Sequence, residues 1–236
     1  MVILEASWSK RIRALYPPIF KRPVTVDSKM QVRQVAEARF PCRFGEFRIF
    51  GFRGSTDGFR GYPNGTEAET VVLKIGDFTS PGPAPLVRIH SQCLTGDVFG
   101  SLRCDCGQQL EIALEQIAKE GRGLLIYDPQ EGRGIGLINK LMAYQLQDEG
   151  ADTVEANEQL GFDADQRNYS LAVEVMRHFG LSKVRFLSNN PAKVEALEAG
   201  GIEVEERVPC EAVVSEVAAG YLRTKKEKMG HLFGGS

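Results

Sequence analysis

The sequence predicts an α/β protein with some α+β character, in which a β-rich N-terminal half is followed by alternating strands and helices. Two patterns lead to this prediction. Residues 47–52 alternate apolar with other residues at the period of two that is typical of strands. Apolar residues at helical spacing first occur after Cys106, and from there helical and strand-like segments take turns.

The first half is expected to hold strands separated by turns. Short apolar runs at residues 70–75 and 85–89 predict two strands in addition to the one at 47–52. Residues 54–66 are rich in Gly, Pro and Asn and predict a loop, and residues 79–83 predict a turn. We therefore expect the sheet to begin with antiparallel strands.

The second half is expected to alternate between strand and helix. Residues 109–120 place Leu110, Leu114 and Ile117 on one helical face, and Gly121 follows as a stop signal. The same reasoning predicts strands at 124–127, 184–187 and 202–204, and helices at 135–149, 170–179 and 192–199. Because no repeat or linker interrupts it, we expect residues 31–236 to form a single domain.

Residues 1–30 differ from the rest and are expected to form a basic N-terminal extension. Prolines at three positions interrupt any long helix there. The segment has two acidic residues and six basic ones, Lys10, Arg11, Arg13, Lys21, Arg22 and Lys29. Six charges are a weak signal for a nucleic-acid partner, and a surface arm is the simpler interpretation.

Composition argues against several classes of protein. The net charge is −2 in 236 residues, whereas proteins that coat nucleic acid usually carry a strong basic excess. No apolar run reaches the roughly 20 residues of a membrane helix. The N-terminus lacks the pattern of a signal peptide, and the odd number of cysteines, 5, makes a poor disulfide framework. We therefore expect a cytoplasmic protein with reduced thiols.

Three cysteines have spacing that suggests a metal site. Cys104 and Cys106 are separated by one residue, and Cys93 precedes Cys104 by eleven positions. Three soft ligands suit zinc and leave a fourth position for water, which is typical of a catalytic site. Two alternatives remain open: the thiols are ordinary buried side chains, or His90 completes a closed structural site. Cys42 and Cys210 stand alone.

Several strand-to-helix junctions have the composition of anion-binding sites. Arg88 is predicted at a strand end beside the cysteines, where it would bind phosphate or form an ordinary surface ion pair. Residues 130–136 are glycine-rich and lie between a strand and a helix, as in an anion site or a simple turn. Lys193 lies in the first turn of a predicted helix, where its charge opposes the helix dipole.

A loop before the helix at 170–179 contains Asp165 and Arg167. This pair would serve as a base beside an electrophile or nucleophile. The alternative is helix capping by Asp165 or Asn168, which is the commoner role of such residues.

These segments together resemble GTP cyclohydrolase II. The resemblance extends from about residue 31 to the Lys-Met-Gly-His at 228–231 and does not include residues 1–30. Its motifs are RIHSQCLTGD at 88–97, SLRCDCG at 101–107, QEGR at 130–133, DTVEAN at 152–157, LGF at 160–162 and SNNP at 188–191.

The resemblance implies the fold and activity of that family. The chain would hydrolyse GTP to 2,5-diamino-6-ribosylamino-4(3H)-pyrimidinone 5′-phosphate, formate and pyrophosphate, which is the first step of riboflavin biosynthesis. It implies catalytic zinc on Cys93, Cys104 and Cys106, where attack at C8 of the purine opens the imidazole ring, and magnesium on the triphosphate. It also implies a homodimer, while the composition predicts no membrane or nucleic-acid partner.

Particular residues acquire roles from the resemblance. Asp165 would accept a proton, Arg167 would be the nucleophile toward the α-phosphate, and Tyr144 would lie near the zinc and C8. Because guanidinium stays protonated, electrostatic stabilisation is the plainer role for Arg167. Glu131 could also accept hydrogen bonds from the guanine edge. The implied GTP-binding residues are Arg88, Ile89, His90, Ser91, Gln92, Gln109, Glu131, Gly132, Arg133, Thr153, Ser188 and Lys193.

The chain departs from the family pattern at two positions. Gln92 stands where the pattern often has Glu, which would change the charge beside the metal. Ser188 replaces Thr and keeps the hydroxyl. The change at Gln92 motivates an alternative, a homologue that stops at a formylated pyrimidine or uses another nucleotide. Tyr144, which goes with complete loss of the formyl group, favours the full reaction. A non-catalytic nucleotide-binding protein is the third possibility.

Overall fold

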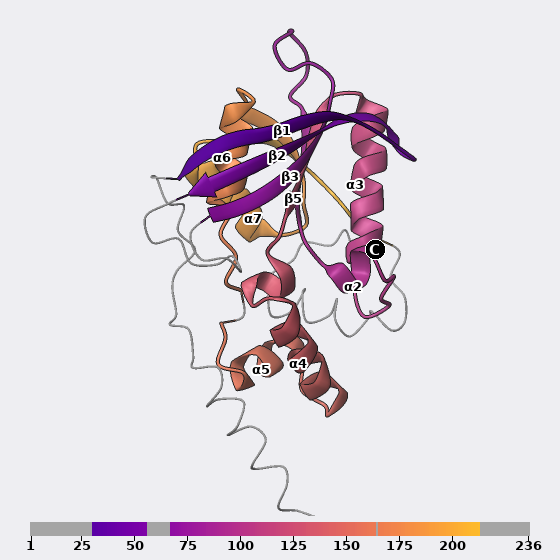
Figure 1. Cartoon of the computed structure of the whole chain (residues 1–236), viewed down its shortest axis with the longest axis vertical. Coiled ribbons are helices and arrows are strands. Elements are labelled where there is room, and N and C mark those ends of the chain that lie inside the picture. The colour runs from indigo at the N-terminus through magenta and orange to yellow at the C-terminus, as the bar shows by residue number, and fades with distance from the viewer. Residues whose placement is uncertain (1–29, 56–66, 164, 213–236) are drawn as a thin grey trace, which may run out of the picture.

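The computed structural model describes residues 30–55, 67–163 and 165–212, which form a mixed seven-stranded sheet with helices on both faces (Figure 1). The strand order is β1-β2-β3-β5-β4-β6-β7. One part of this sheet is antiparallel and the other is parallel, and the two parts meet at β5.

The antiparallel part consists of β1 (Gln31–Cys42), β2 (Gly45–Ser55) and β3 (Glu67–Ile75), and β3 pairs with β5 (Gly123–Asp128). Successive side chains of β2 face opposite sides of the sheet. Phe50 and Phe52 therefore join the core on one face, whereas Phe47 joins the core on the other. β1 forms an edge of the sheet, and most of its side chains are exposed.

The parallel part consists of β5, β4 (Leu86–Ser91), β6 (Lys183–Leu187) and β7 (Glu203–Val208), in that spatial order. β4 and β5 are buried along almost their whole length. Parallel strands covered on both faces have such continuous apolar runs, which explains why these strands are readily visible in the sequence.

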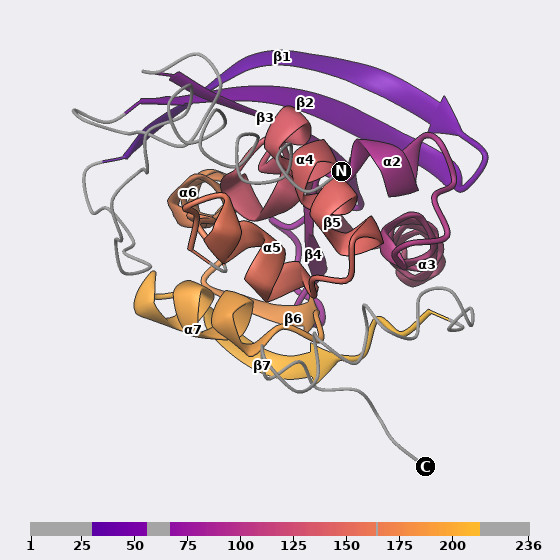
Figure 2. The ribbon, with the colours of Figure 1, turned by 90° about the horizontal axis from the view of Figure 1, so that it is seen from below.

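Helices α3 (Cys106–Glu120), α6 (Ser170–His178) and α7 (Pro191–Ala199) cover the sheet. Figure 2 shows α3 on one side of the sheet, with α6 and α7 on the other. The apolar face of α3 contributes Ala113 and Ile117 to one core cluster. α6 contributes Val173 and Met176 to the cluster on the opposite face.

The remaining helical segments lie at the carboxyl ends of β4 and β5. Figure 1 shows α4 and α5 below the sheet, where they pack around a small core of their own that includes Ala143, Ala156 and Phe162. The chain leaves β4 toward α3 and leaves β5 toward α6, on opposite faces, and this divergence opens a crevice at the strand ends. The segments are α2 (Leu94–Asp97), the 3₁₀ turn η1 (Glu131–Gly134), α4 (Leu137–Asp148) and α5 (Thr153–Gln159).

The predicted fold class is confirmed, with differences in several elements. α3 begins at Cys106, three residues before the predicted start. The sequence pattern did not predict β1 or α5 as elements. Gly54 and Ser55, expected in a loop, belong to β2, and the rest of that predicted loop, residues 56–66, lies outside the described residues.

In the described part of the chain, no helix is long and apolar enough to cross a membrane.

The basic extension and the C-terminal motif are not placed by the structure. Residues 1–29 and 213–236 lie outside the described residues, and so does residue 164. The division into an extension at 1–30 and a domain at 31–236 therefore stays a prediction.

Candidate active site

The three clustered cysteines converge at the entrance to the crevice. Cys93 follows β4 and precedes α2, Cys106 is the first residue of α3, and Cys104 lies between the two helices. Their sulfur atoms all lie within 4.8 Å of one another. Tetrahedral zinc, with Zn–S bonds of about 2.3 Å, separates its sulfurs by about 3.8 Å, and the Sγ atoms of Cys93 and Cys104 are 3.6 Å apart. The cluster therefore fits a zinc ion.

Two glycines make room for this convergence. A Cβ atom added to Gly96 would lie 3.0 Å from Sγ of Cys104 and 3.2 Å from Sγ of Cys93. A Cβ atom added to Gly107 would lie 2.5 Å from the backbone oxygen of Gly96. A side chain at position 107 would therefore push α3 away from α2, and one at position 96 would crowd the cysteine sulfurs.

The cluster favours loss of a proton from Cys93. Hydrogen bonds with the Cys104 and Cys106 thiols, helped by the Lys140 ammonium, hold the pKa of Cys93 far below its usual range. The Cys106 thiol would lower the pKa of Cys104 as well, but the Cys93 thiolate and burial outweigh this effect and raise it. The N-terminus of α3 also favours negative charge at Cys106. A metal ion bound here would displace the thiol protons, so that all three cysteines could bind it as thiolates.

His90 lies outside the thiol group, although it is only three residues from Cys93. Its Nε2 lies 3.0 Å from Oδ1 of Asp97, and both side chains are buried. Asp97 also accepts hydrogen bonds from the Cys93 backbone N–H at 3.0 Å and the Tyr127 hydroxyl at 2.8 Å. Burial lowers the pKa of His90 despite the hydrogen bond to Asp97. His90 thus packs against the loop of Cys93 and is not placed as a fourth ligand.

Lys140 and Glu131 form a buried ion pair beside the thiols, at a distance of 2.7 Å. The same ammonium lies 3.1 Å from Sγ of Cys93 and 3.0 Å from Oγ1 of Thr95. Burial would lower the pKa of Lys140, but the Cys93 thiolate and the Glu131 carboxylate outweigh it and raise that pKa above its usual value. Lys140 is therefore a cation in this site.

Tyr144 lines the crevice together with the cysteines. Its hydroxyl lies 3.3 Å from Oγ1 of Thr95, and the Arg103 guanidinium lies over its ring at 4.8 Å from the centroid. Burial raises the pKa of Tyr144, although the bond with Thr95 and the charge of Lys140 act against the shift. Tyr144 is therefore a neutral hydroxyl near the cysteines.

Cations gather at the opposite end of the crevice, in a cluster we call the cation cradle, made of Arg88, Arg167 and Lys193. The charged ends of Arg167 and Lys193 lie 5.8 Å and 5.7 Å from the ring centroid of Tyr169. Arg88 and Lys193 are each 5% exposed. Burial, reinforced by Arg88 and Arg167, holds the pKa of Lys193 well below its usual value. The carboxylates of Asp165 and Asp128 offset part of this positive charge, and a cluster of guanidinium and ammonium groups is suited to binding a polyanion.

Hydrogen bonds orient the members of the cradle. Arg88 donates to the backbone oxygen of Leu187 at 3.0 Å and to Oε1 of Gln109 at 2.7 Å, so it does not form the surface ion pair considered above. Lys193 donates to the backbone oxygen of Ile89 at 2.8 Å. Within the described residues, the buried Nε of Arg88 and hydroxyl of Tyr169 have no hydrogen-bond partner. Both are donors that a bound anion would satisfy.

Asp165 and Arg167 form an ion pair in the loop before α6. Nε of Arg167 lies 2.9 Å from Oδ1 of Asp165, and the Arg167 backbone N–H donates to the same oxygen at 3.1 Å. Nη1 of Arg167 also reaches Oγ of Ser91 at 3.3 Å. Burial would raise the pKa of Asp165, but Arg167 outweighs it and lowers that pKa. Asp165 does not cap α6; instead, Asn168 accepts a hydrogen bond from the Ser170 backbone N–H at 2.8 Å.

The turn η1 supplies backbone groups to the same wall. Gly132 and Arg133 both have left-handed backbone conformations, with φ of 61° and 62°. Arg133 is the one residue other than glycine with positive φ in the described chain, and such strain is common at functional sites. The Arg133 backbone oxygen accepts a hydrogen bond from the Gln166 N–H at 3.0 Å, which joins η1 to the loop of Arg167.

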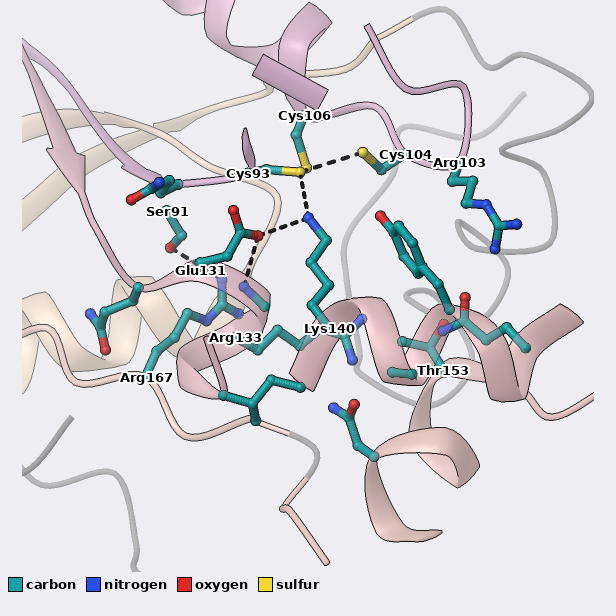
Figure 3. Close-up of a pocket in the computed structure, with 18 of the residues that line it drawn as sticks. Ser91, Cys93, Arg103, Cys104, Cys106, Glu131, Arg133, Lys140, Thr153 and Arg167 are labelled. Atoms are coloured by element: carbon teal, nitrogen blue, oxygen red, sulfur yellow. Dashed lines mark hydrogen bonds and ion pairs between the residues drawn. The ribbon is translucent and has the colours of Figure 1, made fainter. Parts of the chain in front are cut away.

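A cavity of about 540 Å³ joins these groups, within the size range of small-molecule sites. Figure 3 shows the three cysteines and Lys140 at one end, with Arg133 and Arg167 at the other. The predicted site residues that line it are Ser91, Gln92, Cys93, Cys104, Cys106, Glu131, Gly132, Arg133, Tyr144, Thr153 and Arg167.

The other predicted site residues lie behind the cavity wall. Arg88, Ile89 and Lys193 belong to or contact the cation cradle, and Gln109 joins Arg88 to Asp105. The Ser188 hydroxyl accepts a hydrogen bond from the Asn190 N–H at 3.1 Å at the start of α7. His90 contacts Asp97, as described above, and Asp165 contacts Arg167.

Nine residues that line the cavity were not predicted as site residues, and among them are Arg103, Lys140 and Asn157. Lys140 carried a recognisable signal, because a basic residue near the start of α4 opposes the helix dipole, as Lys193 does in α7. Arg103 and Asn157 lie within segments of the family resemblance, but neither has a local pattern that indicates a site.

Comparison with known proteins identifies the relatives of the chain. A family model described as GTP cyclohydrolase II matches residues 33–209. The GTP cyclohydrolase-2 of Hahella chejuensis is 51% identical over 203 residues, which cover 86% of this chain and 93% of that protein. The GTP cyclohydrolase-2 of Saccharophagus degradans is 49% identical over 205 residues, 87% of this chain and 98% of that protein.

Longer relatives match over part of their length. The riboflavin biosynthesis protein RibBA of Chlorobium phaeovibrioides is 50% identical over 201 residues, 85% of this chain and 47% of that protein. The chain therefore spans about half the length of this relative. A solved structure of RibBX, described as a two-domain 3,4-dihydroxy-2-butanone 4-phosphate synthase from A. baumannii, has a TM-score of 0.43 at 16% identity over 87% of this chain and 44% of that chain. That likeness is too distant to carry a conclusion.

Proposed function

The chain belongs to the GTP cyclohydrolase II family, and from this premise we propose that its crevice converts GTP to 2,5-diamino-6-ribosylamino-4(3H)-pyrimidinone 5′-phosphate, formate and pyrophosphate. This reaction is the first step of riboflavin biosynthesis. The observation that supports it most strongly is the joining of two unlike groups by one cavity, three thiols at one end and the guanidinium of Arg167, part of the cation cradle, at the other. A purine nucleoside triphosphate matches this arrangement, because its electrophilic ring carbon could lie at the thiols while its triphosphate lies at Arg167.

The thiols of Cys93, Cys104 and Cys106 are the proposed zinc ligands. Their spacing matches the sulfur separation of a tetrahedral zinc site, and all three cysteines line the cavity. Zinc bound there would supply a Lewis acid and a water that loses its proton near neutral pH.

Tyr144 is proposed to orient the purine ring so that C8 faces the thiols. Its hydroxyl stays protonated, because its pKa is raised, and can donate a hydrogen bond to a nitrogen of the opening ring. Arg103 over the ring and Thr95 at the hydroxyl fix its position. Thr153, at the first position of α5, and Gln92 line the cavity and are proposed to contact the nucleoside.

The triphosphate is proposed to enter the cation cradle with a magnesium ion. Arg88 and Lys193 would supply charge, while Gln109 orients Arg88. Gly132 and Arg133 line the cavity and are proposed to contact the phosphates, although the Gly132 N–H already donates to Glu131. Ser91 and Ser188 would add hydroxyl groups, and the backbone at Ile89 and His90 holds the strand end in place.

Asp165 and Arg167 are proposed to act on the phosphate end of the substrate. Arg167 stays protonated beside the Asp165 carboxylate, so we assign it to stabilising the negative charge on the departing pyrophosphate and not to nucleophilic attack. Asp165 has a lowered pKa and is ionised, as a proton acceptor must be before it acts.

Glu131 is proposed mainly to fix the neighbouring backbone and Lys140 in place, and only secondarily to bind the guanine edge. Its carboxylate already accepts hydrogen bonds from the backbone N–H groups of Leu94, at 2.7 Å, and Gly132, at 3.0 Å, and from Lys140. Of about four lone-pair directions on a carboxylate, one is left for a base.

Assembly and location follow from the family in the same way. We propose a homodimer in the cytoplasm, with residues 31–236 as the catalytic domain and residues 1–30 as an extension. Light scattering of the purified chain and of a variant that begins at residue 31 tests the dimer and the extension together. An active dimer of the shorter chain is the expected result.

The activity is tested by measuring formate and pyrophosphate released from GTP by zinc-loaded protein with magnesium. One equivalent of each per GTP consumed is expected. Pyrophosphate without formate would support the formylated product that Gln92 suggests. ATP is the control nucleotide, and equal consumption of ATP and GTP would contradict the proposed specificity. No consumption of either would favour a non-catalytic protein.

A further inference from the structure

Lys140 is placed between the thiols and the wall of the crevice, and none of the proposed catalytic steps uses it. Its side chain is 11% exposed and extends from α4 toward the sulfurs. Figure 3 shows it between the cysteine cluster and Glu131, with interactions drawn to both. A buried lysine loses side-chain entropy and hydration, so its retention here needs compensating contacts.

The ammonium of Lys140 lies over the Tyr144 ring, 5.6 Å from its centroid, and its polar contacts lead to the segment that carries the first zinc ligand. The ammonium lies 3.1 Å from Sγ of Cys93 and 3.0 Å from Oγ1 of Thr95. It also lies 2.7 Å from Oε1 of Glu131, whose other oxygen accepts the N–H of Leu94 at 2.7 Å. Residues 93, 94 and 95 are therefore all bound, directly or through one carboxylate, by the Lys140–Glu131 pair.

The charge balance gives Lys140 a second effect. Three thiolates and a divalent ion together carry one negative charge, and the ammonium beside Cys93 would compensate it. A hydrogen bond donated to a thiolate withdraws electron density from the sulfur, so the sulfur donates less to its metal. A zinc ion that receives less electron density from the Cys93 sulfur would be a stronger Lewis acid.

We propose that Lys140 is a positioning residue for the zinc site, which it serves in two ways: it fixes the Cys93 segment against Glu131, and it donates a hydrogen bond to the Cys93 sulfur. The inference rests on the proposed function because it assumes zinc on the three cysteines. It assigns to Lys140 a role toward the metal and not toward GTP. A plain structural ion pair between α4 and η1 would affect folding but would leave the properties of the bound metal unchanged.

The test compares Lys140→Met with the parent and with Lys119→Met, a matched control on the exposed surface of α3. Zinc affinity is measured by competition with a chromophoric chelator, and cobalt(II) is bound in place of zinc to record its sulfur-to-metal charge-transfer bands. Lys140→Met is expected to bind zinc about 10- to 100-fold more weakly, the usual effect of losing a group that orients a ligand. Its cobalt bands should shift, because the Cys93 sulfur has lost a hydrogen bond, whereas Lys119→Met should match the parent.

Folded Lys140→Met protein with parental zinc affinity and parental cobalt bands would overturn the proposal. If Lys140→Met does not fold, Glu131→Gln and Lys140→Arg provide the measurement instead. Lys140→Arg should retain most of the affinity because it keeps the charge, and Glu131→Gln should lose affinity because the Cys93 segment is released. Parental affinity in Glu131→Gln would overturn the proposal as well.

These outcomes are separable from failure of the proposed function. A parent protein that binds one zinc but releases no formate from GTP would contradict the function and leave the role of Lys140 standing. A parent that binds no zinc would contradict both. Weaker zinc binding in Lys140→Met with full activity at saturating zinc would support the positioning role alone.

Discussion

The antiparallel and parallel parts of the sheet contribute very differently to this molecule. Among the residues that the structure describes, those that line the cavity lie between Ser91 and Arg167, at or after the end of β4, and none comes from β1, β2 or β3. The antiparallel strands supply buried aromatic side chains such as Phe47, Phe50 and Phe52. The parallel strands end at the crevice and carry the groups that we assign to chemistry.

This difference shows how one sheet separates stability from catalysis. Parallel strands end together at one edge, so loops from β4, β5 and β6 meet there and bring distant residues into contact. Antiparallel neighbours alternate in direction, and their connections are divided between both edges. Changes in the antiparallel part should therefore affect folding, and changes at the parallel edge should affect turnover.

The largest effect is expected from removal of one thiol. Cys104→Ser should lower turnover of GTP at least about 1000-fold, because loss of the metal removes several kcal/mol of barrier reduction. Bound zinc, measured by elemental analysis, should fall with it. Activity that persists without zinc would contradict the assignment of catalysis to the cysteine cluster at the end of the parallel strands.

A core substitution in the antiparallel part should act on stability instead. Phe52 is 1% exposed and packs edge-on against Phe179, with ring centroids 5.7 Å apart. Phe52→Ala should lower the free energy of unfolding by about 3–5 kcal/mol. Turnover per folded, zinc-loaded molecule should be unchanged, and the exposed Val35→Ala serves as the control on β1. A fall in turnover at full folding would mean that the two parts are not separable.

Arg167 should affect chemistry more than binding. Arg167→Ala is expected to lower kcat about 100- to 1000-fold, the usual effect of losing one preorganised donor at a developing charge. If the group acts only in the transition state, kcat and kcat/KM should fall equally. A rise in KM with unchanged kcat, measured by steady-state kinetics, would instead assign Arg167 to ground-state binding of the triphosphate.

The smallest effect concerns pH. Because the pKa of Lys193 lies well below its usual value in the free protein, a bound triphosphate should raise it and draw in a proton. Affinity for GTP should therefore decrease as pH rises through that range. Calorimetry in two buffers with different ionisation enthalpies should show proton uptake, which Lys193→Met should reduce. Proton release on binding would contradict the assignment of Lys193 to the polyanion.

The sequence predicted the parallel part better than the antiparallel edge, for a physical reason. β4 and β5 are buried on both faces, so their apolar runs are unmistakable, whereas most side chains of β1 are exposed and polar. α5 was missed although its start is encoded locally. Asp152 accepts hydrogen bonds from the N–H groups of Val154 and Glu155, and the Glu155 carboxylate accepts one from the Asp152 N–H. This capping box was visible in the sequence.

The sequence predicted the cysteine cluster of the site but not the contact made by Lys140. The spacing of Cys93, Cys104 and Cys106 predicted one cluster, and the structure brings their sulfurs together. The contact between Lys140 and Cys93 depends on how α4 docks against the loop after β4. Residues 47 positions apart in the chain carry no local signal of such a contact.

We propose that the crevice at the carboxyl ends of the parallel strands opens the purine ring of GTP and removes its formyl carbon. The most direct test is mass spectrometry of the pyrimidine product formed from GTP by the zinc-loaded chain, with Cys104→Ser as the control. We expect the diaminopyrimidinone monophosphate from the parent and unchanged GTP from the variant. A pyrimidine that retains the formyl carbon, or the same product from the zinc-free variant, would contradict it.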